Sequence, residues 1–272
     1  MKISLFGSCR LLCINKYFQC TGLNESISYT HTTGEAIQLA KFINGNIEIP
    51  EEVRKYCFRT GIIHNKLITY TKEFQKEFQE TDLFVIEVCS IKNYMYNDFH
   101  IHHLAVDKRL NYYQNTPKEI TCNTRIVRQK ESDIEKDLLK INNMIGNKKI
   151  LIVSHINAMA NKNIIINYYK QLQNLSGKIK AIGDDQTIDT SNNFFTKKIH
   201  IAKRAALIKS LSAITKKLNM HFLDPSIILT KFPQHKILVE EKFGSPPGHY
   251  TEFGQEQAGK LFFEKITNIM SQ

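Results

Sequence analysis

The sequence lacks several features that would assign a protein class at once. It has no run of 18 apolar residues, which predicts no transmembrane helix, and its apolar start is too short for a signal-peptide core. No GxxxxGK[ST] or GxGxxG motif indicates a nucleotide-binding loop. No RNP-like aromatic pattern or finger spacing indicates nucleic-acid binding. We therefore expect a cytoplasmic protein with no membrane span and no nucleic-acid partner.

The cysteines form no CxxC pair, which argues against a zinc site. A chain of 272 residues without a signal peptide does not need disulfides, so most of the six cysteines are expected to be small apolar or incidental residues. The histidines His100, His102 and His103 lie close together, but no set of neighbouring residues completes a tetrahedral arrangement of ligands. We therefore expect no metal.

Lysine and arginine total 37 residues against 26 acidic ones, giving a formal net charge of +11. A basic balance suits nucleic acid, an acidic membrane or a phosphorylated ligand. Here the lysines are scattered among asparagine and isoleucine, which is typical of a solvated surface. Hydrophobic residues make up 42% of the chain, enough for a sizeable core.

Short apolar runs alternate with helical patterns, which predicts βαβ units and a parallel sheet. The expected fold is a single α/β domain over residues 1–272, a three-layer sandwich around a mostly parallel five-stranded sheet. Residues 92–125 show no clean period and are expected to form an insertion near the sheet edge, and residues 180–196 a loop. Strands are predicted over 2–7, 26–30, 82–88, 149–154 and 220–224, and helices over 10–18, 34–43, 50–58, 65–80, 130–145, 163–173, 197–218 and 251–270.

Ligands in open α/β sheets bind beyond the carboxyl ends of the strands. Polar and reactive side chains gather at these ends, and a loop before the last helix adds His249. The strand-end residues are Ser8, Cys9, Arg10, His31, Thr32, Ser90, Lys92, Asn93, His155 and Asp224. His31 and His155 could instead bond a neighbouring carbonyl, and Asp224, which precedes a proline, could be a turn former.

The start of the chain, Leu-Phe-Gly-Ser-Cys-Arg, places Cys9 after an apolar strand and a glycine, at the start of the next helix. There the helix dipole and free N–H groups favour a thiolate and can bind an oxyanion. This start resembles block I of the SGNH/GDSL family, an apolar strand followed by Phe-Gly-Asp-Ser. Ser8 falls on the family's Asp, and Cys9 falls on its nucleophilic Ser.

The segment before the last helix resembles block V of the same family, with His249, Thr251 and Gly254 in register. Thr251 also makes a good N-cap. Pro246 stands where the family has its Asp, so the resemblance implies a Cys9–His249 dyad. A thiol, with a pKa of about 8.5, needs less activation than a hydroxyl. Asp224 or a backbone carbonyl is left to orient the imidazole.

Block III is matched only in part by Val-Cys-Ser-Ile-Lys-Asn over residues 88–93, which lacks the family's glycine and shifts its asparagine. Candidates for contacts with an oxyanion or substrate are therefore Ser8, Arg10, His31, Thr32, Ser90, Lys92, Asn93 and His155.

Within this superfamily, the Gly-Ser-Cys start is most similar to the branch that has Cys in place of the nucleophilic Ser. That branch includes the GSCFA proteins and the WcbI-type polysaccharide-biosynthesis enzymes, which are linked to coenzyme A and acyl transfer. This resemblance implies an acyltransferase moving an acetyl group from acetyl-CoA through a Cys9 thioester to a sugar or glycan amine or hydroxyl. The alternatives are an SGNH-type esterase or deacetylase acting on a glycan, and a non-catalytic member that binds glycan or protein. The acceptor, the acyl chain and the oligomeric state, a homo-oligomer included, stay open.

Overall fold

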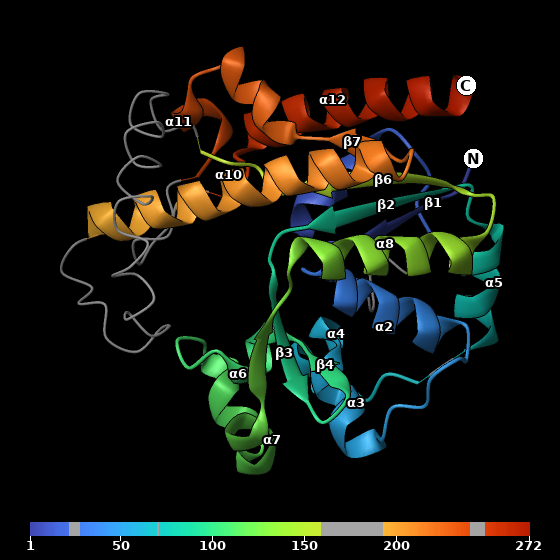
Figure 1. Ribbon diagram of the computed structural model, residues 1–272, viewed down its shortest axis with the longest axis vertical. Coiled ribbons are helices and arrows are strands. Elements are labelled where there is room, and N and C mark those ends of the chain that lie inside the picture. The colour runs from blue at the N-terminus through green and yellow to red at the C-terminus, as the bar shows by residue number, and fades with distance from the viewer. Residues whose placement is uncertain (22–27, 70, 159–192, 240–247) are drawn as a thin grey trace.

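The computed structural model describes residues 1–21, 28–69, 71–158, 193–239 and 248–272 (Figure 1). Its centre is a four-stranded parallel sheet in the order β1-β2-β6-β7. Every residue of β2 is buried, as expected for a strand whose two faces are both covered. The strands are β1 (Ile3–Phe6), β2 (Leu83–Val88), β6 (Lys149–Ser154) and β7 (His221–Leu223).

Helices follow and separate these strands. They are the 3-10 helices η1 (Cys9–Lys16), η2 (Asn111–Asn115) and η3 (Pro225–Thr230), and the α-helices α2 (Thr33–Ile43), α3 (Glu51–Cys57), α4 (Arg59–Ile63), α5 (Lys72–Glu80), α6 (His103–Val106), α7 (Lys118–Asn123), α8 (Glu131–Ile145), α10 (Asn193–Lys217), α11 (Gln234–Ile237) and α12 (Glu252–Ser271).

Helices cover both faces of the parallel sheet. The crossovers between consecutive strands carry α2, α8 and α10, whose buried residues share one core with Phe84 and Ile152. Crossovers of one hand in a sheet whose strands follow chain order must lie on one face. The opposite face is covered by η1 and α12, which pack on Leu5 and Val85. Figure 1 shows α12 on one side of the sheet and α8 on the other.

The expected fifth strand over 26–30 is wrong for the residues that the structure describes. Residues 28–30 form no strand, and the first two residues of the prediction lie outside the described residues. The free edge of β1 is instead shared by two segments: Thr21 N–H donates to Ile3 O at 3.0 Å, and Gly7 N–H donates to Ser28 O at 2.9 Å. The edge of β1 that does not pair with β2 is therefore covered by irregular chain in place of a fifth strand.

The insertion expected over 92–125 is a second sheet with short helices. Its three antiparallel strands, in the order β4-β3-β5, are β3 (Lys92–Tyr96), β4 (Phe99–Ile101) and β5 (Arg125–Arg128). A tight turn at Asn97, with φ of 51°, joins β3 to β4. These strands are short and only partly buried, so they leave no clean hydrophobic period in the sequence.

The other predicted elements agree with the structure to within a few residues, apart from 10–18, which is a 3-10 helix, and 65–80. Among the described residues of 65–80, only α5 is helical. Asn65 has a positive φ of 51°, and Thr71 caps α5 by accepting from Phe74 N–H at 3.1 Å. The predicted helix over 163–173 and most of the loop over 180–196 lie outside the described residues, and residues 193–196 belong to α10. Among the described residues, we find no helix whose length and apolar character would let it cross a membrane.

Candidate functional site

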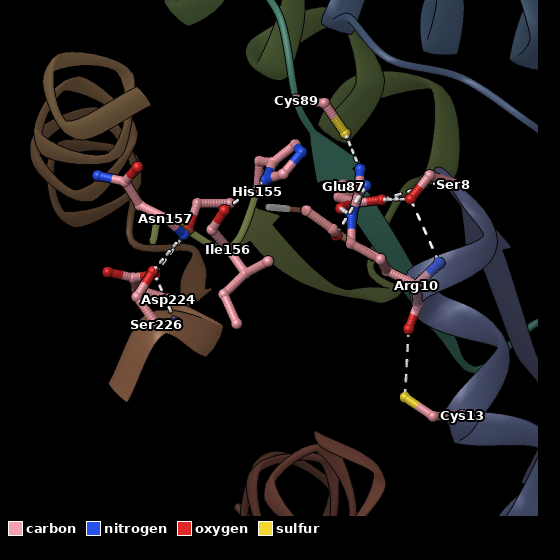
Figure 2. A network of polar contacts seen from close by, with 12 residues as sticks. Ser8, Arg10, Cys13, Glu87, Cys89, His155, Ile156, Asn157, Asp224 and Ser226 are labelled. Carbon is pink, nitrogen blue, oxygen red and sulfur yellow. Dashed lines mark hydrogen bonds and ion pairs between the residues drawn. The ribbon is translucent and has the colours of Figure 1, made fainter. Parts of the chain in front are cut away.

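A buried carboxylate, Glu87 of β2, organises the carboxyl end of β1. The amide and hydroxyl of Ser8 donate to its Oε2 at 2.8 and 2.5 Å, and Arg10 Nε donates to its Oε1 at 2.7 Å (Figure 2). Glu87 is 1% exposed and Arg10 is 8% exposed. A buried ion pair is tolerated only when further hydrogen bonds satisfy both charged groups. These bonds therefore hold the turn after β1 against β2.

Both members of the Glu87–Arg10 pair are charged at neutral pH. Burial alone would raise the pKa of Glu87, but Arg10 and the hydrogen bonds from Ser8 outweigh it and lower that pKa. Burial alone would lower the pKa of Arg10, and the charge of Glu87 raises it. Each of these two buried charges therefore stabilises the other.

Gly7 is required by close packing at the same turn. A Cβ at this position would lie 2.6 Å from Glu87 Cβ and 2.7 Å from Leu11 Cδ1. No other residue fits without moving β2 or η1. The Gly-Ser-Cys sequence thus combines a glycine that lets two elements approach with a serine that caps η1.

Cys9 and His249 come together from opposite ends of the chain. Cys9 is exposed at the first position of η1, after the N-cap Ser8. A hydrogen bond with His249 lowers the pKa of the Cys9 thiol most, and the charge of Arg10 lowers it further, against the opposing effect of burial. The thiolate is thus more accessible at neutral pH than in an ordinary cysteine.

Short backbone contacts position His249. Leu238 and Tyr250 form an isolated antiparallel bridge, and Val239 N–H donates to His249 O at 2.9 Å. Thr251 caps α12 as expected, by accepting from Gly254 N–H at 2.9 Å. His249 is therefore held between a short ladder and the start of a long helix.

Arg10 also reaches this loop, since its Nη1 donates to Gly248 O at 3.4 Å. A Cβ at Gly248 would lie 2.9 Å from His155 Cε1, so the His155 ring packs directly against the loop. Burial and the charges of Arg10 and Arg204 lower the pKa of His155 well below its usual value. Its Nδ1 lies 2.5 Å from Ile156 O, the alternative role expected from the sequence (Figure 2). His155 is thus a neutral ring that supports the loop.

Asp224 takes the turn-forming role that the sequence left open. Its Oδ1 accepts from Ser226 N–H at 2.9 Å and from Ser154 Oγ at 3.1 Å, which caps η3 after β7. Ser226 Oγ in turn accepts from Asn157 N–H at 2.8 Å (Figure 2). These contacts join the carboxyl ends of β6 and β7 and do not support Asp224 as the group that orients His249.

The remaining predicted residues form a second group where α2 meets the antiparallel sheet. Thr32 caps α2, and its hydroxyl donates to Asn93 Oδ1 at 2.5 Å. Ser90 Oγ accepts from Lys92 N–H at 3.0 Å within the turn before β3. His31 O accepts from the amides of Cys89 and Ser90, at 2.8 and 3.0 Å. These hydrogen bonds hold the turn and the helix start in place.

Sequence reasoning missed Glu87, although the sequence carries a signal for it. Glu87 is a charged residue in the otherwise apolar run of β2, and such a strand buries both faces. A buried carboxylate needs a cationic partner, and Arg10 directly follows the candidate nucleophile.

Comparison with known proteins gives a similarity along the whole chain. A family model described as the TviD N-terminal domain matches residues 1–118, less than half of the chain; this part includes Cys9 and Glu87 but not His249. The chain is 22% identical, over 307 aligned residues, to the Vi polysaccharide biosynthesis protein TviD of Salmonella typhi. The alignment covers 98% of this chain and 32% of that protein, so the chain spans about a third of its relative's length. No solved structure matches.

Proposed function

We propose that this protein is a cysteine-dependent acyltransferase that moves an acetyl group from acetyl-CoA to a hydroxyl or amine of a sugar or glycan. The observation that carries the proposal is the exposed Cys9 thiol, whose pKa is lowered chiefly by its hydrogen bond with His249. The name of the similar Salmonella typhi protein, a polysaccharide biosynthesis protein, supports a glycan as acceptor. The resemblance of the Gly-Ser-Cys turn to the coenzyme A-linked branch supports the donor.

In the first half-reaction, His249 takes the proton of Cys9 and the thiolate attacks the thioester carbonyl. The bond to the coenzyme sulfur breaks, leaving acetyl-Cys9, and the departing thiolate takes the proton back from His249. One thioester replaces another, so this step is close to isoenergetic. An alkyl ester donor would face an uphill acylation, which is why a thiol nucleophile favours transfer from a thioester.

In the second half-reaction, the acceptor hydroxyl or amine attacks the acetyl carbonyl while His249 takes its proton. Cys9 leaves as the thiolate. The charge of Arg10 lowers the pKa of Cys9 and so stabilises this leaving group. Arg10 carries that charge in a buried position because Glu87 balances it.

The start of η1 supplies a donor for the tetrahedral oxyanion. Arg10 N–H is directed to Ser8 Oγ at 3.3 Å, and Leu11 N–H donates to Ser8 O at 3.1 Å. The Cys9 amide has no hydrogen-bond partner within the described part of the chain. An N–H at the start of a helix, adjacent to the nucleophile, is a typical oxyanion donor. The net charge of +11 would suit the coenzyme's phosphates.

Intact mass spectrometry after incubation with acetyl-CoA tests the proposal. The unmodified chain should gain one acetyl group and release free CoA thiol. Cys9→Ala should gain none, and Cys89→Ala, which removes a neighbouring thiol, should be acetylated like the unmodified chain. No adduct and no CoA release from the unmodified chain, or an adduct that persists in Cys9→Ala, would overturn it.

Exposure of both Cys9 and His249 favours a second candidate, an esterase or deacetylase in which water attacks the acetyl-enzyme. Labelled acetyl-CoA distinguishes the two when glycan acceptors are present. Label from acetyl-CoA recovered on a sugar identifies the transferase. Release of unlabelled acetate from an acetylated glycan, without consumption of acetyl-CoA, identifies the hydrolase.

A further inference from the structure

Three histidine rings meet at the junction between the parallel sheet and the antiparallel sheet. His31 comes from the segment before α2, and His102 and His103 come from the junction of β4 and α6. Their ring centres are 5.2 Å apart for His31 and His102, and 4.6 Å apart for each pair that includes His103. One possible ligand atom from each residue lies within 4.8 Å of the others.

We propose that His31, His102 and His103 form a binding site for a divalent transition-metal ion, Zn²⁺ in the first place, with a fourth position open to a water or an anion. The expectation of no metal rested on the lack of a further ligand near residues 100–103. The structure supplies this ligand from His31, far away in the sequence. The proposal is independent of the acyltransferase function.

The spacing of the rings fits a single ion. Three imidazoles bound tetrahedrally to one zinc at about 2.0–2.1 Å have ring centres about 5 Å apart. The observed separations of 4.6 to 5.2 Å bracket this value, so binding requires ring rotation and small shifts. Imidazole nitrogens suit zinc, copper, nickel and iron(II), and three protein ligands with one open position are typical of a catalytic zinc site.

Burial favours the neutral, metal-binding form of two of the three rings. Burial lowers the pKa of His102 well below its usual value and that of His103 to about 4. These two imidazoles are therefore neutral at neutral pH and carry a lone pair. In the described part of the chain, the buried atoms His102 Nε2 and His31 Nδ1 make no hydrogen bond. A bound ion would satisfy the first of these atoms.

Glu35 lies beside the His31 ring, on the side where carboxylates lie beside metal-bound histidines. Its Oε2 accepts from His31 N–H at 2.6 Å and lies 3.6 Å from His31 Nδ1. With the ring proton facing this carboxylate, the other ring nitrogen is left for the ion. Glu35 is buried, and although burial raises its pKa, its contacts with His31 outweigh that effect and lower it. A negative charge therefore stands beside the proposed cation.

Binding at His102 Nε2 has one local cost. In the ion-free arrangement, His102 Nδ1 accepts from Leu104 N–H at 3.3 Å, a long hydrogen bond that places the ring proton on Nε2. Coordination through Nε2 moves this proton to Nδ1, so the bond at the start of α6 is given up. Two arginines also place positive charge near the rings: Arg59 lowers the pKa of His102, and Arg109 lowers that of His103. The charge of Arg109 is balanced by its ion pair with Asp107 at 2.7 Å.

The test is direct titration of chelator-treated protein with Zn²⁺ and Co²⁺. It is performed in a Cys9→Ala background, because an exposed thiol beside His249 is itself a zinc ligand. We expect one equivalent to bind, with a Co²⁺ visible spectrum of tetrahedral nitrogen coordination and no thiolate charge-transfer band. His103→Ala should weaken binding by about 100-fold or more, and Glu35→Gln by about 10- to 100-fold.

His235→Ala is the matched control, because this exposed histidine lies outside the cluster. It should bind the ion as tightly as the background protein. Circular dichroism identifies any variant that does not fold, and His31→Ala provides a second ligand deletion if His103→Ala is one. Absence of saturable binding by the background protein, or unchanged binding in both ligand deletions, would overturn the proposal. Neither result depends on an acyl donor.

Discussion

Cys9 and Cys89 follow neighbouring parallel strands, and Arg10 lies close to both. Even so, the pKa values of their thiols are shifted in opposite directions. The pKa of Cys9 is lowered, first by the hydrogen bond with His249. The pKa of Cys89 is raised well above its usual value by burial and by the charge of Glu87, although Arg10 Nη2 donates to its sulfur at 3.1 Å. A position at the carboxyl end of a strand is therefore not enough for reactivity; exposure and a histidine partner decide it.

Glu87→Gln removes the negative charge that raises the pKa of both thiols. The buried Arg10 would lose its partner, and loss of one member of a buried ion pair costs about 3–5 kcal/mol. Urea unfolding should show a correspondingly lower free energy of unfolding. The matched control is Glu256→Gln on the surface of α12, which should leave the midpoint unchanged. Equal midpoints for both variants would contradict the role of Glu87.

The same pair predicts the pH dependence of stability. Because the pKa of Glu87 is lowered in the folded chain, its contribution is present above the unfolded value of about 4.3 and is lost as pH falls through the folded value. Glu87→Gln should therefore lower stability at neutral pH, and its difference from the unmodified chain should shrink in acid. Urea midpoints measured across this range give the result, and a difference that grows in acid would contradict the account.

A smaller effect is expected from Asp224→Asn. Asparagine caps a helix about as well as aspartate, so η3 should persist. If Asp224 only forms this turn, its substitution should change the free energies at the Cys9 site very little. The alkylation rate of Cys9 should then stay within about 2-fold of the rate in the unmodified chain. The same rate is measured for His249→Ala. If Asp224→Asn decreases the alkylation rate as much as His249→Ala does, Asp224 is the residue that orients the imidazole.

The sequence predicted the parts of the fold and site that depend on local patterns. The apolar run of β2, the Gly-Ser-Cys turn and the cap at Thr251 all belong to one short segment each. What it did not predict depends on contacts between distant segments. Ser28 beside β1, Glu87 against Arg10 and His31 against His103 have no local period, and the short strands of the antiparallel sheet are too little buried to show one.

We propose that His249 activates Cys9, and the pH dependence of the Cys9 alkylation rate measures this activation. Iodoacetamide labelling is followed at each cysteine by peptide mass spectrometry, for the unmodified chain and for His249→Ala. The rate at Cys9 should rise with a midpoint below the ordinary thiol value of about 8.5, and His249→Ala should move this midpoint upward. Cys89 should stay slow over the same range. An identical midpoint for Cys9 in both proteins, or Cys89 reacting as fast as Cys9, would contradict the account.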